Sequence, residues 1–373
     1  MKFVCFHLMP YRPLDMAARA NHRSAWVVLP NALYDPVKGA EEYEAYLDQL
    51  TYAETLGFDA IGVNEHHQTA YGMMPAPNLI ASALIQRTKK AKIAILGRAL
   101  PLTNSPIAIA EEFAMLDNLS RGRIIAGFVR GIGTEYHATG LNPSFSLERF
   151  QEAHDLIVSA WTRPGPFEFE GEHFNVRYVN LWPRPYQSPH PPIWIPSMGS
   201  SETIRWAAAP ERKYPFLVTF SAHELVARYL NLYRDAARQF GYAAAPIYVA
   251  DTDARARAEA KAGIESLFND FLANPWEMLL PPGYTSLASM KNTMRVRKAL
   301  GSRARNQTID DLVESGTVIA GSPRTVREAI ARMREATGFN ILVALLQFGV
   351  LTNELTRRNM DMFAAEVMPH FKD

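Results

Sequence analysis

The chain is poor in cysteine, in long apolar runs and in excess charge of either sign, and each shortage excludes a class of protein. Among 373 residues there is one cysteine, Cys5, so no intramolecular disulfide can form, as is usual in a reducing compartment. No segment approaches the roughly 18 apolar residues of a membrane span, and the N-terminal MKFVCFHLMP is too short for a signal peptide. The 39 basic and 38 acidic residues nearly balance, which argues against nucleic-acid binding. We therefore expect a cytoplasmic protein with neither nucleic acid nor membrane as its partner.

Short apolar segments alternate with longer amphipathic segments along almost the whole chain. Repeated strand–helix units with fully apolar strands predict an α/β fold with a parallel sheet covered on both faces. Eight such units favour a single (β/α)8 TIM barrel, and an open doubly wound sheet is the alternative. The strands are expected at residues 3–8, 59–64, 91–100, 122–129, 191–197, 214–220, 245–250 and 339–349.

Two stretches interrupt this rhythm within what we expect to be one domain, residues 1–373. Residues 162–191 are rich in proline, glycine and aromatic side chains, and residues 274–311 are long and polar to basic. Both are predicted to be loop insertions at the C-terminal face, the second a lid, although surface excursions without a role fit the pattern too. Ser105 and Ser146 are expected to cap the helices that follow them.

The strongest candidate for chemistry is Glu65-His66-His67, at the end of the second predicted strand. Active sites of (β/α)8 barrels lie at the C-terminal ends of the strands, which favours a functional role. Metal binding is the chemical alternative, but adjacent side chains on a strand point to opposite faces and do not converge easily. The chain has neither a His-Glu-x-x-His motif nor a cysteine cluster, so no metal is expected.

A glycine-containing segment, residues 130–140, follows the fourth predicted strand. Gly131 and Gly133 permit a tight turn with exposed backbone N–H groups, and Arg130 carries a permanent charge suited to a phosphate. The dinucleotide fingerprint is absent, because Tyr136 stands where it requires a third glycine.

Three further strand ends carry weaker signals. Residues 196–203, PSMGSSET, place small hydroxyl side chains before a helix, which suits either an anion site or an ordinary serine cap. Residues 319–330 repeat this pattern and are interpreted mainly as a cap. Gly97 would let a flat ring approach the backbone, or would mark a β-bulge. No Gly-x-Ser-x-Gly elbow is present, so these features suit a phosphate-bearing cofactor or substrate without selecting the reaction.

On these residues the chain resembles the bacterial luciferase-like flavin monooxygenases over nearly its whole length. The likeness includes AETLGFDAIGVNEHH, PPIWIPSMGSSET and, as a specific signature, LDNLSRGR before GFVRG. The resemblance implies a barrel that binds FMN at its C-terminal mouth and receives reduced FMN from a separate flavin reductase. O2 would then form a C4a-hydroperoxyflavin that oxygenates a small organic substrate, expected to be apolar or aromatic. The family's habit also implies a homodimer or homotetramer.

The resemblance assigns roles to particular positions. His66 matches the family's catalytic histidine, and Arg130 would contact the phosphate or the ribityl chain. Val129 replaces a reactive but non-essential cysteine. Of the two neighbours of His66, Glu65 is expected to orient a ring or a neighbouring strand, and His67 to support the wall or a subunit contact. The remaining cofactor-binding residues implied are Leu96, Gly97 and Arg98 beside the ring and Ser197, Met198, Gly199, Ser200 and Ser201 around the phosphate.

Three rival functions fit parts of the same pattern. A deazaflavin (F420)-dependent oxidoreductase shares the fold, but that branch often shows a single histidine after aspartate at the second strand end. A non-catalytic flavin-binding relative is disfavoured by the presence of His66 and Arg130. A sugar-phosphate enzyme would need a clear lysine or a paired carboxylate set, which the chain lacks.

Overall fold

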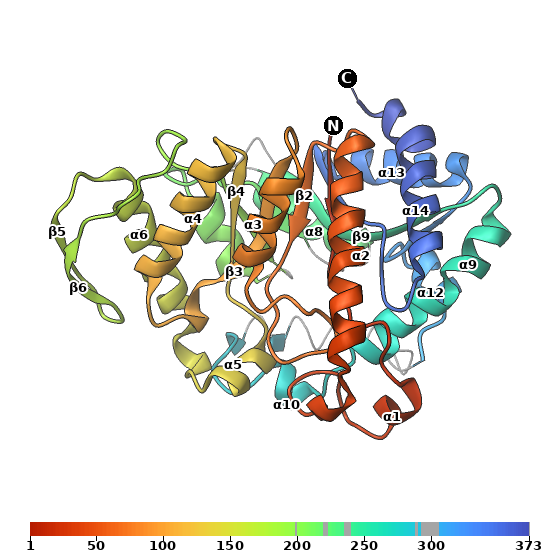
Figure 1. Ribbon diagram of the computed structural model, residues 1–373, viewed down its shortest axis with the longest axis horizontal. Helices are drawn as coiled ribbons and strands as arrows, with labels where there is room; N and C mark the ends of the chain where they lie inside the picture. The colour runs from red at the N-terminus through yellow and green to blue at the C-terminus, as the bar shows by residue number, and fades with distance from the viewer. Residues whose placement is uncertain (198–199, 219–222, 235–239, 288–289, 292–305, 373) are drawn as a thin grey trace.

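The computed structural model describes residues 1–197, 200–218, 223–234, 240–287, 290–291 and 306–372 (Figure 1). Met198 and Gly199 of the expected phosphate loop lie outside the described residues. So does much of the expected lid, at residues 288–289 and 292–305.

The predicted α/β barrel is confirmed, with eight parallel strands paired in a ring. From β1 the pairing runs through β2, β3, β4, β7, β8 and β9 to β11, which pairs with β1 again. The strands are largely apolar because helices cover their outer faces, and their charged residues are Lys2, Lys92 and Arg98. Their bounds are β1 (Lys2–Phe6), β2 (Ala60–Val63), β3 (Lys92–Ala99), β4 (Ile124–Val129), β7 (Ile193–Ser197), β8 (Phe216–Val218), β9 (Phe240–Val249) and β11 (Ile341–Leu345).

A ninth strand departs from the prediction. Ile319–Gly321, interpreted from the sequence mainly as part of a cap, forms the short strand β10 beside the end of β9. Ser322 directly after it does cap the next helix, since its Oγ accepts from the N–H of Thr325. The cap interpretation is therefore confirmed at Ser322, and the strand before it was not predicted.

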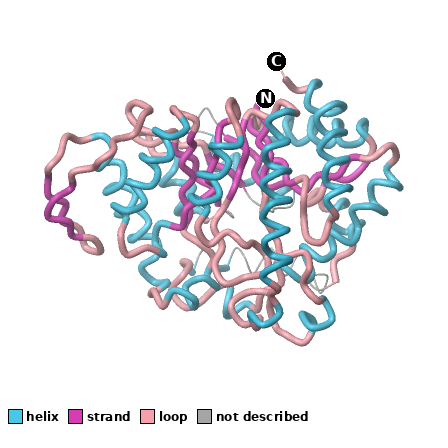
Figure 2. The backbone as a smooth tube through the Cα atoms, viewed as in Figure 1, coloured by secondary structure: helices cyan, strands magenta, loops and turns pink. Residues whose placement is uncertain are grey.

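Helices surround the ring of strands (Figures 1 and 2). Ser105 caps α4 as predicted, with its Oγ accepting from the N–H of Ala108. The prediction for Ser146 is wrong: it is the first residue of α6, and its Oγ accepts instead from Arg130. The covering helices are α2 (Pro36–Thr55), α3 (Pro77–Arg87), α4 (Pro106–Ser120), α6 (Ser146–Thr162), α7 (Ser201–Ala208), α8 (His223–Arg234), α9 (Asp253–Ser266), α12 (Ile309–Glu314), α13 (Pro323–Thr337) and α14 (Asn353–Met362).

The first interruption contains an antiparallel hairpin, β5 (Phe167–Glu170) with β6 (Asn175–Val179), which projects from the barrel (Figure 1). Its turn, residues 171–174, is tied to α6, because the carboxylate of Glu152 accepts the N–H groups of His173 and Phe174. The prediction that residues 162–191 lie at the C-terminal face is wrong: they connect the end of α6 to the start of β7, away from the C-terminal mouth, so the hairpin is a surface excursion.

Three short helices gather below the strands in Figure 1, at the C-terminal mouth: α1 (Met16–Ala20), α5 (Gly133–Thr139) and α10 (Trp276–Leu279). α5 follows β4 directly, and α10 belongs to the second interruption. Thr134 Oγ1 donates to the carbonyl of Met278, so α5 and α10 are joined. Within the described residues, no helix combines the length and apolarity needed to cross a membrane.

Candidate active site

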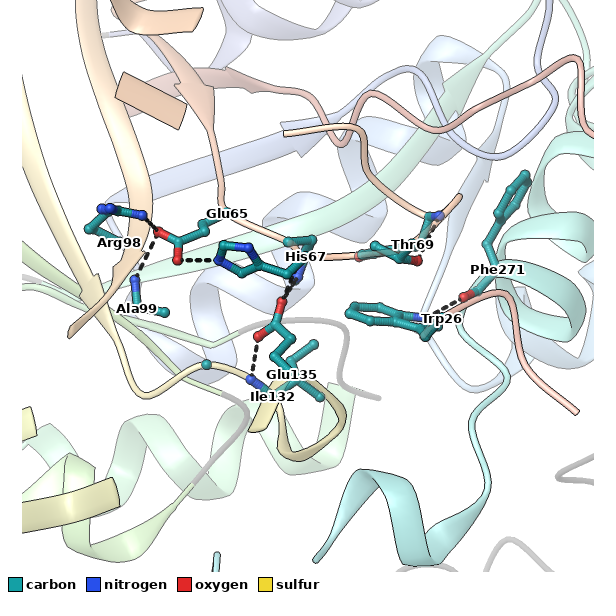
Figure 3. A network of polar contacts seen from close by, with 12 residues as sticks. Trp26, Glu65, His67, Thr69, Arg98, Ala99, Ile132, Glu135 and Phe271 are labelled. Atoms are coloured by element: carbon teal, nitrogen blue, oxygen red, sulfur yellow. Dashed lines mark hydrogen bonds and ion pairs between the residues drawn. The ribbon is translucent and has the colours of Figure 1, made fainter. Parts of the chain in front are cut away.

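His66 lies just beyond β2 with its ring held on three sides. Nδ1 is 3.0 Å from Oε1 of Glu135, and the side chain is only 11% exposed. The rings of Trp26 and Tyr71 meet the imidazole edge-on at centroid distances of 5.1 and 4.9 Å. Trp26 is itself fixed, because its indole N–H donates to the carbonyl of Phe271 (Figure 3). This packing holds the imidazole in one orientation.

Glu135 reaches His66 from the first turn of α5 and is almost fully buried. Its Oε1 also accepts from the backbone N–H of His67 at 3.2 Å, and its Oε2 accepts from Ile132 at 2.8 Å (Figure 3). Because a carboxylate only accepts, a neutral His66 carries its proton on Nδ1. Nε2 is then the basic nitrogen, and no described residue forms a hydrogen bond with it.

His67 contacts a different carboxylate, that of Glu65, with Nε2 2.8 Å from Oε1. The other oxygen of Glu65 accepts from Arg98 at 2.5 Å and from the N–H of Ala99 at 3.2 Å (Figure 3). Glu65 therefore joins the ends of β2 and β3. The adjacent histidines face separate partners, as their alternation along an extended chain requires.

His67 should make stability depend on pH. Its hydrogen bond to Glu65 raises the pKa of His67 above the ordinary value of 6.5, and burial opposes this rise less strongly. A raised folded-state pKa means that this contribution to stability is complete below pH 6.5 and is lost as the pH rises through the folded value. We expect the difference in unfolding free energy between wild type and His67→Asn to shrink over that interval in urea titrations. A difference that stays constant or grows would contradict this assignment.

Arg130 follows β4 and is enclosed by α6 and the second interruption. Its Nη2 donates to Ser146 Oγ at 2.7 Å and to the carbonyl of Tyr284 at 2.5 Å, and the guanidinium lies 5.0 Å from the Tyr284 ring. Within the described structure, the Nε atoms of Arg130 and Arg98 are buried without a hydrogen-bond partner. A buried unpaired donor is costly, so both positions fit an acceptor-rich ligand such as FMN.

The end of β3 is closely packed against β4. The Leu96–Gly97 peptide bond is cis, and the pairing of β3 with β4 shifts register between Ile95 and Arg98. A Cβ on Gly97 would lie 2.7 Å from the carbonyl oxygen of Gly127, so a larger residue cannot fit there. The irregularity expected of a β-bulge is thus present, and Gly97 itself is buried against β4.

The serine-rich segment after β7 carries an acid that the sequence reading did not use. Ser200 caps α7 as the cap alternative predicted, and Ser197 ends β7. Glu202 accepts from the hydroxyls of Ser200 at 3.0 Å, Ser201 at 3.2 Å and Ser286 at 2.6 Å. A carboxylate therefore occupies hydroxyl donors of the expected phosphate loop, and it links that loop to the second interruption.

The described candidates therefore lie at the C-terminal mouth, each at the end of a different strand: His66 after β2, Arg98 in β3, Arg130 after β4 and Ser197 in β7. Three contributors were missed: Glu135, Glu202 and Tyr284. Glu135 stands at the acidic position of a helix first turn, the only signal that could have singled it out. Among the described residues, no group of three or more His, Cys, Asp or Glu side chains is placed to hold a metal ion.

The sequence is similar to that of known monooxygenases over most of its length. The family model described as luciferase-like monooxygenase matches residues 23–340. An alkanal monooxygenase alpha chain from the Kryptophanaron alfredi symbiont is 26% identical over 86% of this chain and 90% of its own. The uncharacterized protein y4wF of Sinorhizobium fredii is 40% identical, but the match spans 44% of this chain and only 48% of that protein.

Solved structures share the fold across the whole chain. The oxygenating constituent of 3,6-diketocamphane monooxygenase from Pseudomonas putida, in complex with FMN, aligns with TM-score 0.75 and 19% identity, covering 100% of this chain and 99% of its own. An F420-dependent secondary alcohol dehydrogenase aligns with TM-score 0.66 and 18% identity, over 100% and 99%. At such identities these likenesses concern the fold alone.

Proposed function

Because the chain belongs to the luciferase-like monooxygenase family, we propose that it uses reduced FMN and O2 to oxygenate a small apolar or aromatic molecule. The reduced FMN would come from a separate flavin reductase. The single observation that carries this proposal is the buried His66–Glu135 pair at the strand ends, close to buried N–H donors without partners. We further propose a single barrel domain that works in the cytoplasm as a homodimer or homotetramer.

Residues already placed at the mouth could hold FMN. Arg130 and Arg98 offer buried Nε donors. Leu96 and Gly97 are proposed to lie beside the ring, and Ser197, Ser200 and Ser201 beside the phosphate. Met198 and Gly199, which complete the proposed phosphate loop, lie outside the described residues. Glu202 would have to release its serine hydroxyls for the phosphate to accept them. When bound, reduced FMN supplies the electrons that activate O2 for transfer of one oxygen atom.

His66 would act as the proton carrier of this site. Glu135 keeps the proton on Nδ1, which leaves Nε2 to take up or return a proton during oxygenation. Trp26 and Tyr71 pack against the ring and fix its orientation. We regard Glu135 as a positioning residue, since it acts through His66.

Arg130→Met should weaken FMN binding by roughly 10- to 100-fold, because a charge-assisted hydrogen bond contributes about 1.5–3 kcal/mol. Quenching of FMN fluorescence during titration measures the dissociation constant. Arg163→Met is the matched control, because Arg163 packs over Phe167 in the projecting hairpin segment. The FMN affinity of this variant should match that of wild type. Unchanged affinity in Arg130→Met would remove Arg130 from the cofactor site.

The proposed function is tested by reconstitution with FMN, a flavin reductase and NADH. Aldehydes, ketones, amines and aromatic compounds are screened for oxygenated product formed in step with NADH consumption. Product with FMN supports the proposal, whereas turnover only with F420, recognised by the absorption of the bound cofactor, supports the oxidoreductase alternative. Absence of FMN-dependent O2 consumption with any reductase would favour a non-catalytic flavin-binding protein.

A further inference from the structure

A cavity of about 540 Å3 lies on one side of His66. Its walls come from residues between 11 and 34 after β1, from residues between 66 and 75 after β2, and from Tyr43 on α2. Among the described members of the proposed FMN-binding and catalytic set, His66 alone lines it. The volume falls within the roughly 300–1,000 Å3 typical of small-molecule pockets. The cavity is therefore a second compartment that shares one residue with the proposed cofactor site.

The cavity wall carries no fixed charge. Among the described residues that line it, none is Asp, Glu, Lys or Arg, and His66 is the only group that can be charged near neutral pH. Its polar contributors are the neutral side chains of Asn31, Gln68 and Thr69 and the phenols of three tyrosines. An anionic ligand would lose hydration here without gaining an ionic partner, which is unfavourable.

The hydroxyls of Tyr43 and Tyr11, two of the tyrosines that line the cavity, already form hydrogen bonds within the protein. Tyr43 donates its hydroxyl to the carbonyl of Met73 at 2.5 Å, and burial raises the pKa of Tyr43 above its ordinary value. The hydroxyl of Tyr11 accepts from the N–H of Asp35, and its ring lies 4.9 Å from that of Tyr34. Because these hydroxyls already have partners, the rings offer apolar contact area to a ligand.

We infer that this cavity receives the organic substrate of the proposed oxygenation and selects neutral, largely apolar molecules over carboxylates, sulfonates and phosphates. The inference rests on the proposed function, since it assigns the cavity to the compound being oxygenated. His66 joins the two compartments, so a substrate seated here lies beside the group that would carry its proton. Tyr11, Tyr34 and Tyr43 are then specificity-determining residues.

The experiment uses the fluorescent neutral probe N-phenylnaphthylamine and the flavin-free full chain. Probe fluorescence should rise on binding, and acetonaphthone should displace the probe at a concentration at least tenfold lower than naphthoate of the same isomer. Leu33→Trp, which fills the cavity from its rim, should weaken probe binding at least tenfold. Leu29→Trp tests the same point from the neighbouring wall if Leu33→Trp lowers the thermal midpoint.

A variant that introduces a positive charge tests whether the preference for neutral ligands belongs to this cavity. Asn31→Lys places a cation at the exposed rim and should reduce the preference for acetonaphthone at least threefold, whereas Asn31→Gln should leave it unchanged. Equal displacement by both competitors, or probe binding that is unchanged in both tryptophan variants, would overturn the inference.

FMN-dependent O2 consumption is measured separately, so failure of the proposed function is distinguished from failure of cavity selectivity. For any substrate found, Leu33→Trp should raise KM without changing FMN affinity; an unchanged KM would also overturn the inference.

Discussion

His66→Ala should lower coupled product formation by roughly two to four orders of magnitude, the usual contribution of a positioned general acid or base. NADH oxidation by the reductase should continue, with its electrons diverted to hydrogen peroxide. FMN affinity should change little, because the residues proposed to bind the phosphate belong to other strand ends. Product, peroxide and NADH are measured in the same reaction, so the coupling ratio is the readout.

The neighbouring histidine provides a matched control for His66. His67 lies next in the sequence and is also bonded to a carboxylate, but its partner is Glu65, which joins β2 to β3. His67→Ala should therefore act mainly on stability and leave most of the coupling ratio intact. Coupled turnover that survives in His66→Ala, or falls equally in both variants, would remove the proposed proton-carrying role.

Most of the barrel could be predicted because its strands are buried on both faces and are therefore largely apolar. The short strand β10 was missed because three residues give too little pattern to separate a strand from the cap beside it. The hairpin of β5 and β6 was missed although β5 alternates strictly as Phe-Glu-Phe-Glu, because strands of four and five residues inside a stretch rich in proline and glycine give too short a pattern.

The site could be predicted only where a residue stands at a strand end. His66 and Arg130 do so, and the barrel rule places both at the same mouth. Glu135 contacts His66 across 69 sequence positions, and the hydroxyl of Tyr284 reaches the carbonyl of Gly131 across 153. Such pairs depend on how a loop folds back over the barrel, which local periodicity does not encode.

Ser146 shows why a correct residue can receive a wrong role. A serine at the start of a helix is a favoured cap, but in α6 it lies one residue inside the helix. Its hydroxyl is then free to accept from Arg130, a partner 16 positions earlier. Ser146 serves the guanidinium of Arg130 because leaving a buried N–H donor unpaired costs more free energy than leaving a helix without a side-chain cap.

Glu65→Ala should lower the free energy of unfolding by about 3–5 kcal/mol, because it leaves the largely buried Arg98 without its anion. Glu44→Ala is the matched control: Glu44 also pairs with an arginine, Arg87, but its side chain is 64% exposed and Glu65's is 1%. The control should cost about 1 kcal/mol or less. Urea unfolding of both variants measures the difference.

A double variant separates the ion pair from simple loss of packing. If the cost of Glu65→Ala comes from an uncompensated Arg98, then combining Glu65→Leu with Arg98→Met should recover part of the lost stability, since apolar side chains of similar volume often replace a buried pair without penalty. His67 would lose its partner in the same double variant, so its pKa should return toward its ordinary value. No recovery, or equal costs for Glu65→Ala and Glu44→Ala, would show that Glu65 does not stabilise the join between β2 and β3 through charge. Recovery would mean that this carboxylate serves first to hold the strand ends around His66 in place.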